Sequence, residues 1–249
     1  MARSLPLDSA RMAWWLSAWL RGDATPDDVL DGVLDGDAAH HVAGLPGDSG
    51  PQSLVLALGP LRRLGPTSAG LALPAAGDLT GLGGPPAFNA AALEAGEAVV
   101  LEGAGHGLVP HRAGAGVVWQ LMAAERRQLD DLRETDRSLR AAITTTATTL
   151  ADLEVAKWRP EIADELMNLR HVPTYASPAG TPRQAVSLAG RALQAAGIAE
   201  LAGQDDGGTM SAWEIAQRTD ALRPLEYAAR RALVAACSPE VWPPDPGRG

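Results

Sequence analysis

The stretch VVWQLMAAERRQLDDLRETDRSLRAAITTTATTLADLEVAK, residues 117–157, holds the longest periodic pattern in the chain. An apolar residue returns every three or four positions along it, as on one face of a helix: Val118, Met122, Leu129, Leu132, Leu139, Ile143, Leu150 and Leu153. Polar residues interrupt the pattern at Glu125, Asp136, Thr146 and Lys157. The pattern predicts one long helix over 117–157 with a coiled-coil-like stripe.

Two hypotheses account for this stripe. It packs inside the chain against predicted helices at 160–170, 182–201 and 211–236, or it stays uncovered and pairs with a second copy or another protein. In the second hypothesis, the seam is formed by Met122, Leu129, Leu132 and Leu139. The five threonines between 144 and 149 have low helix propensity because their β-branched side chains are restricted. We expect a kink or a tightly packed turn there.

Two helices are predicted at the N-terminus. The first carries an apolar face at helical spacing and ends at Gly22: Met12, Trp15, Leu16, Trp19 and Leu20. The second begins with Thr25 as N-cap and Pro26 at its first position. The tryptophans at 14, 15 and 19 fill the core, form an exposed interface, where tryptophan is favoured, or dock on a membrane surface, which the acidic residues 23–37 would oppose. Trp15 and Trp19 are therefore candidate interface residues.

The middle of the chain has a different pattern, with short apolar runs punctuated by Gly and Pro. These runs predict strands at 53–59, 70–74, 97–103, 107–111 and 116–121, with a short helix at 85–96 closed by Gly96. The fold expected is α+β, with N-terminal helices, a small β-rich middle and a C-terminal helical bundle with one long helix. The expected segments are 1–50, 51–116, 117–238 and a Pro-rich tail at 239–249.

Composition restricts the classes of protein that fit. The chain has 249 residues, 46% of them hydrophobic, which suits a globular core. Its net charge is -9, and residues 1–50 carry 3 basic and 8 acidic residues, which opposes nucleic-acid binding by the whole surface. The single cysteine, Cys237, excludes an intrachain disulfide and a Cys-rich zinc site. With no long apolar run, no membrane contact is expected, and the chain is predicted to be cytoplasmic.

The C-terminal stretch SAWEIAQRTDALRPLEYAARRALVAA, residues 211–236, resembles helix-turn-helix DNA-binding regulators in outline. It predicts a helix at 212–218, a break at 219–222 and a second helix at 223–236. Arg223, Arg230 and Arg231 are the candidate phosphate contacts. An ordinary pair of packed helices gives the same pattern, so both interpretations stay open.

No catalytic or metal motif of the HExxH, CxxC or GxSxG type occurs, and no cofactor is expected. His106 and His111 bracket a short predicted strand, and residues five apart on a strand point to opposite faces. We therefore name no catalytic residue and no metal ligand. The sequence favours a non-catalytic cytoplasmic protein that acts through protein–protein contacts, including self-association as a dimer through the long helix. The alternatives are a DNA-binding regulator using 211–236 and an enzyme with a site in the β-rich middle.

Overall fold

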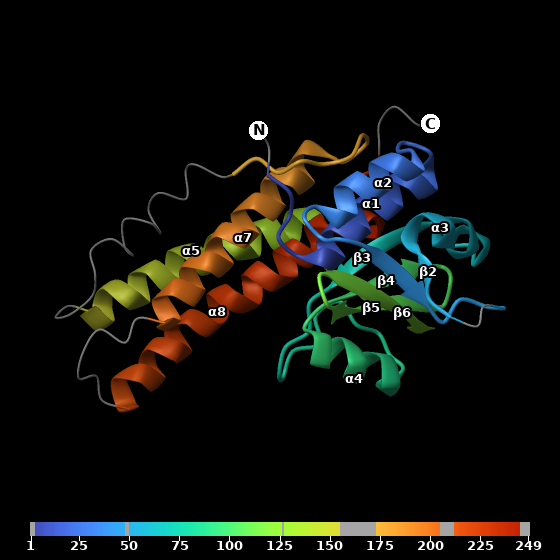
Figure 1. Cartoon of the computed structure of the whole chain (residues 1–249). Coiled ribbons are helices and arrows are strands. Elements are labelled where there is room, and N and C mark those ends of the chain that lie inside the picture. The colour runs from blue at the N-terminus through green and yellow to red at the C-terminus, as the bar shows by residue number, and fades with distance from the viewer. Residues whose placement is uncertain (1–2, 48–49, 126, 155–172, 205–211, 245–249) are drawn as a thin grey trace.

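A six-stranded sheet lies at one end of the molecule and three long helices extend from it (Figure 1). The computed structural model describes residues 3–47, 50–125, 127–154, 173–204 and 212–244. The strand order is β2-β1-β6-β5-β4-β3, and all neighbours are antiparallel except the parallel pair β1 and β6. The strands are β1 (His40–Ala43), β2 (Gln52–Ser53), β3 (Ser68–Ala72), β4 (Ala98–Glu102), β5 (His106–Ala113) and β6 (Gly116–Ala123).

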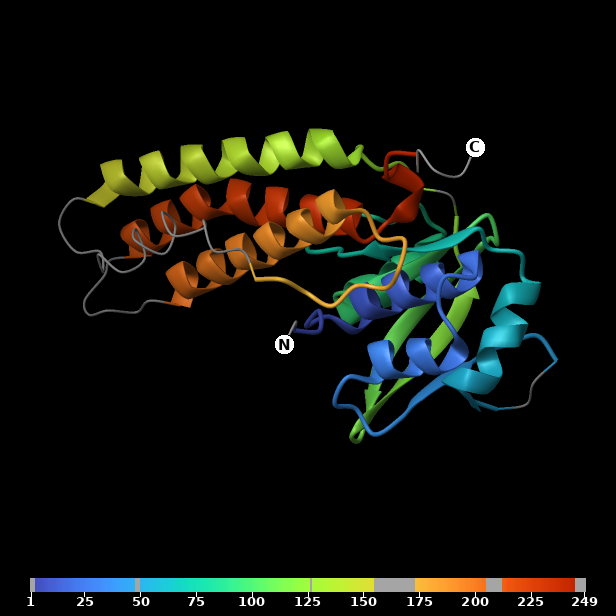
Figure 2. The ribbon, with the colours of Figure 1, turned by 90° about the horizontal axis from the view of Figure 1, so that it is seen from above.

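Helices cover the two faces of this sheet unequally. Helices α1 (Asp8–Arg21), α2 (Pro26–Leu34) and α3 (Leu54–Arg63) lie on one face, and α4 (Pro86–Ala95) lies on the other (Figures 1 and 2). Successive side chains of a strand point to opposite faces of the sheet, so one strand can supply apolar residues to both layers of helices. In β5, Leu108 packs with the larger group of helices, whereas Val109 packs with Phe88 of α4. The fold is therefore mixed α+β, with helices at both ends and a strand-rich middle.

The N-terminal helices begin and end where the sequence predicts. Gly22 ends α1 in a left-handed conformation, with φ of 82°. Thr25 and Asp28 form a reciprocal capping box at the start of α2, with Pro26 at its first position. Trp15 lies against Gly32 of α2, where any larger side chain would collide with the indole ring.

Two elements of the middle differ from prediction. Residues 116–123 form strand β6 in the centre of the sheet, which confirms the strand expected at 116–121 and shows that the overlapping helix expected at 117–157 starts too early. An i, i+4 pair such as Val118 and Met122 fits strand alternation as well as helical spacing, which explains the error. The helix α5 begins only at Leu132, where the Asp131 side chain accepts the backbone N–H groups of residues 133 and 134.

The predicted strand at 53–59 is also wrong, because this run forms helix α3. Its buried residues follow helical spacing: Leu54, Ala57, Leu58 and Leu61. Gly59 and Pro60 hide that spacing in the sequence, because both residues are typical of turns. The helix continues past them because its apolar face is buried against the sheet.

Among the residues that the structure describes, the helical bundle consists of α5 (Leu132–Glu154), α7 (Arg183–Gln204) and α8 (Ala212–Ala236). Helix α8 packs along both α5 and α7 through a core rich in alanine. Leu132 and Leu139 are buried in that core, so this part of the predicted stripe faces inward. The expected helix at 182–201 is confirmed by α7, whereas the expected helix at 160–170 lies outside the described residues.

The threonine run does not interrupt α5. Thr144, Thr148 and Thr149 donate their hydroxyl groups to the carbonyl oxygens four residues earlier, at 3.0–3.1 Å. These bonds satisfy the exposed hydroxyls without breaking the helical ladder. The helix is therefore continuous across the segment where we expected a kink or a tight turn.

Helix α8 is also continuous, so the helix-turn-helix outline is wrong. The predicted break at 219–222 lies within the helix, and Pro224 is accommodated inside it. Because Asp220 and Pro224 are both exposed, water can satisfy the carbonyl oxygen that proline leaves without a partner. The buried residues Leu222 and Leu225 keep the helix in contact with the core across this point.

The edge strand β3 is sealed by groups from outside the sheet. The hydroxyl of Ser17 donates to Ala69 O at 2.8 Å and accepts from Ala69 N at 2.9 Å. The backbone N–H of Leu71 donates to Cys237 O at 3.2 Å, and Arg127 donates to Leu71 O. These bonds leave the edge with few free groups for another strand.

Arg127 contributes most to the protection of this edge, because its fully buried guanidinium joins three parts of the chain. It donates to Leu71 O in β3, to Gly81 O at 2.9 Å, and to two side chains that follow α8. Those side chains are Ser238, bound through Oγ at 2.9 Å, and Glu240, bound through Oε1 at 2.9 Å. A side chain at Gly70 would collide with this guanidinium.

We expect Arg127→Met to lower the free energy of unfolding by about 3–5 kcal/mol, because it leaves a carboxylate and two carbonyls without their donor. Urea denaturation measures this change. The exposed Arg137 of α5 gives a matched control, and Arg137→Met should change the value by less than about 0.5 kcal/mol. Equal effects of the two substitutions would contradict the role assigned to Arg127.

Candidate functional site

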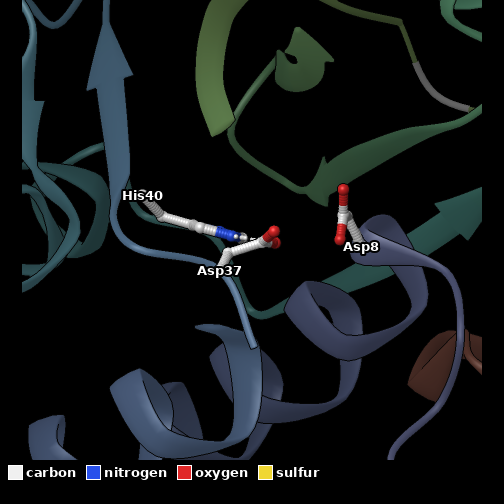
Figure 3. Close-up of side chains that lie close together, drawn as sticks. All are labelled: Asp8, Asp37 and His40. Carbon is white, nitrogen blue, oxygen red and sulfur yellow. Dashed lines mark hydrogen bonds and ion pairs between the residues drawn. The ribbon is translucent and has the colours of Figure 1, made fainter. Parts of the chain in front are cut away.

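Three side chains that could ligate a metal meet beside the sheet, at the start of α1. Asp8 is the first residue of α1, Asp37 precedes β1, and His40 is the first residue of β1 (Figure 3). One potential ligand atom of each lies within 4.8 Å of the others. Distances of this order are compatible with a metal site, so the protonation and pairing of each group decide what the cluster can do.

The hydrogen bonds of His40 fix its neutral tautomer. The indole N–H of Trp119 donates to Nδ1 at 3.1 Å, and an indole can only donate. Nδ1 must therefore carry a lone pair, so Nε2 carries the proton and donates to Asp37 Oδ2 at 3.0 Å. Both ring nitrogens are committed in a fully buried side chain. His40 thus offers no free lone pair to a metal ion.

Two arginines neutralise the two aspartates. Arg112 donates to Asp8 at 2.8 Å and to Asp37 at 2.6 Å, and Arg11 bonds to Asp8 from the same helix. Burial raises the pKa of Asp37, but the hydrogen bonds from His40 and Arg112 and the charge of Arg112 outweigh it and hold this pKa below its usual value. The same pairing with Asp37 raises the pKa of Arg112. The Asp37 carboxylate therefore stays ionised, and both aspartates are paired with arginine.

Glu97 completes the cluster from the residue before β4. Its Oε2 accepts the backbone N–H of Ser9 at 2.9 Å, so it caps the first turn of α1 from another element. Burial raises the pKa of the Glu97 carboxyl, and the bond from Ser9 only partly opposes this effect. The cluster Asp8, Arg11, Asp37, His40, Glu97 and Arg112 ties α1 to the sheet, and its two arginines are paired with its two aspartates.

The cluster has no recognisable motif in the sequence. Its residues are scattered between positions 8 and 112, and only the pairs Asp8–Arg11 and Asp37–His40 have a regular spacing of three residues. That spacing does not link one pair to the other. The cluster requires the parallel pairing of β1 with β6, which places His40 beside Trp119 and is not encoded in local sequence.

The structure separates the predicted interface residues. Trp19, Leu132 and Leu139 are buried, whereas Trp15 is half-buried between α1 and α2. Met122 lies in β6 and Leu129 precedes α5, and both are half-buried against the core. These six residues therefore do not form one exposed seam.

The predicted phosphate contacts are occupied by aspartates. Arg223 pairs with Asp220 at 3.0 Å and Arg230 pairs with Asp78 at 3.1 Å. Arg231 pairs with Asp130. Each cation would have to lose its partner to meet a phosphate, and all three lie on one uninterrupted helix.

The two histidines of the alternative enzyme site lie apart. His106 starts β5, with Nδ1 at 2.7 Å from Ala104 O, whereas His111 is exposed near the other end of the same strand. The structure does not bring them together.

The raised pKa of Glu97 predicts a pH-dependent contribution to stability. Because the folded state holds this proton more tightly, the contribution is full at low pH and is lost as pH rises through the folded pKa. The free energy of unfolding of the wild type, relative to Glu97→Gln, should fall as pH rises above about 4, the ordinary pKa range of glutamate. Urea denaturation across this range measures it. A constant difference between the two proteins would contradict the burial argument.

The pairing within the cluster predicts that divalent cations do not stabilise the protein. A ligand that binds only the folded state raises the midpoint of thermal unfolding. We expect Mg²⁺ or Zn²⁺ at about 1 mM to leave this midpoint unchanged. A saturable increase that disappears in Asp37→Asn would show that the cluster binds metal.

Two family models match consecutive parts of the chain. Residues 9–132 match the Rv1486c-like protein, N-terminal domain, and residues 133–234 match the Rv1486c-like protein, C-terminal domain. The chain is 31% identical to the uncharacterized protein Rv1486c of Mycobacterium tuberculosis (strain H37Rv), over 94% of this chain and 98% of the relative. It is 27% identical to the uncharacterized protein ML1804 of Mycobacterium leprae, over the same shares.

No solved structure matches the chain. Among the described residues, no helix has the length and hydropathy needed to cross a membrane. The two matched domains together span most of the sequence, and the division between them falls at the start of α5. The chain belongs to the Rv1486c-like protein family.

Proposed function

We propose that this protein is a non-catalytic cytoplasmic protein that acts by binding another protein chain through its helical bundle. The observation that carries the proposal is Trp213, which is 68% exposed in the first turn of α8. Tryptophan contributes strongly to protein–protein interfaces because a large apolar ring leaves water when it binds.

A second exposed residue supports the same surface. Leu201, near the end of α7, is 53% exposed. Because α7 and α8 are consecutive packed helices, the end of one and the start of the other lie at the same end of the bundle. That end is far from the sheet (Figure 2). We call Trp213 and Leu201 together the distal surface.

The pairing of the polar cluster also favours binding over catalysis. Catalysis requires a group with a free lone pair or proton beside a substrate, but His40 and the two aspartates are bonded to one another and to arginines. A cytoplasmic setting agrees with the single cysteine, which is buried and requires no oxidising compartment.

Site-specific photocrosslinking tests the proposal. A photoreactive phenylalanine analogue replaces Trp213, and the full-length chain is expressed in its own cells and irradiated. We expect an adduct with one protein of defined mass, because the side chain at 213 would lie inside the contact. Crosslinking to a second copy of this chain would identify self-association.

The matched control places the same analogue at Arg137, an exposed position on α5. No adduct of that mass should form there. Adducts of equal yield at both positions would show collision instead of binding, and absence of any adduct at 213 would contradict the proposal.

A further inference from the structure

A groove lies where the sheet meets the bundle, on a different part of the molecule from the distal surface. Its volume is about 850 Å³, and it is bounded by the end of β4, the segment before α5, α8, and the short 3-10 helix η1 (Pro239–Val241). The described residues that line it are Glu102, Arg127, Gln128, Leu129, Asp130, Arg231, Glu240 and Val241. We call it the junction groove.

The cations of the junction groove already have counter-ions. Arg127 is paired with Glu240 at 2.9 Å, and Arg231 is paired with Asp130. Arg231 also donates to the hydroxyl of Tyr227 at 2.8 Å. Neither arginine is therefore left to attract an anion.

Glu102 is the one carboxylate of the described groove lining that is not paired with an arginine. Its side chain is half-buried, and its carboxylate has no hydrogen bond or ion pair with any residue that the structure describes. With two paired cations and three carboxylates, the described lining carries a net charge of -1. The nearby Gln128 is exposed and offers an amide group for a further hydrogen bond.

We propose that the junction groove binds a basic segment of a partner protein, with Glu102 as the counter-ion of one arginine side chain. A carboxylate can accept two parallel hydrogen bonds from a guanidinium group. The half-buried Leu129 and Val241 provide apolar contact for the carbon chain of that residue. The net charge of -9 attracts a basic partner at longer range.

The character of the groove favours a peptide over a small molecule. Small-molecule pockets are mostly apolar and enclose their ligand, whereas this groove is open and five of its eight described lining residues are charged. A segment that runs along the surface can place one cation at Glu102 and leave its remaining polar groups in water.

Fluorescence polarisation with two labelled peptides tests the proposal on the full chain. The probe is the pentapeptide amide Gly-Arg-Leu-Arg-Gly, and its control carries citrulline in place of each arginine, which removes the charge but keeps the shape. At about 0.15 M salt, where distant charges are screened, we expect saturable binding of the arginine peptide. The citrulline peptide should bind at least about tenfold more weakly, as expected for a lost charge-assisted bond.

Two substitutions that each remove one negative charge show where the peptide binds. Glu102→Gln should weaken binding about tenfold, whereas Glu94→Gln, on exposed α4, should have no effect. Gln128→Glu adds a carboxylate to the groove and should tighten binding, which keeps the test decisive if Glu102→Gln folds poorly. Absence of saturable binding, or equal weakening by Glu102→Gln and Glu94→Gln, would overturn the proposal.

Discussion

The buried guanidinium of Arg127 is the interaction on which the arrangement of sheet and bundle depends. A buried cation is stable only when hydrogen bonds and an opposite charge surround it. Arg127 finds two carbonyl oxygens, a hydroxyl and a carboxylate, contributed by β3, the loop at Gly81 and the segment after α8. Since these groups come together only in the complete fold, the bonds couple the sheet to the segment that follows α8.

This coupling crosses the boundary between the two domains of the family. The N-terminal domain ends at residue 132 and the C-terminal domain begins at 133, yet the end of α8 returns to the sheet. There, Trp14 Nε1 donates to Ala236 O at 3.1 Å, and Cys237 O accepts the N–H of Leu71. The edge of β3 is thus protected by residues that follow the bundle, so the sheet requires the C-terminal segment.

The sequence predicts elements well where local chemistry determines them, and poorly where distant partners do. Gly22, Thr25 and Gly96 mark helix ends through backbone geometry and capping, and all three act as predicted. The run at 53–59 was assigned to a strand but forms helix α3, and the helix expected at 117–157 overlapped the strand expected at 116–121, because short apolar runs fit two periods. The polar cluster could not be predicted, because it depends on the parallel pairing of β1 and β6. Arg127 lay within the helix predicted at 117–157, where an arginine is ordinary. Its role depends on Gly70 and Glu240, which are distant in the sequence and lie beside it only in the fold.

The central claim is that the sheet and the bundle open together because the segment after α8 joins them. Native-state hydrogen exchange, followed by mass spectrometry at increasing urea concentrations, tests it directly. We expect the slowest amides of α7 and α8 to share one free energy of opening with those of β4, β5 and β6. Opening of the bundle at a distinctly lower free energy, with the sheet still protected, would contradict the claim.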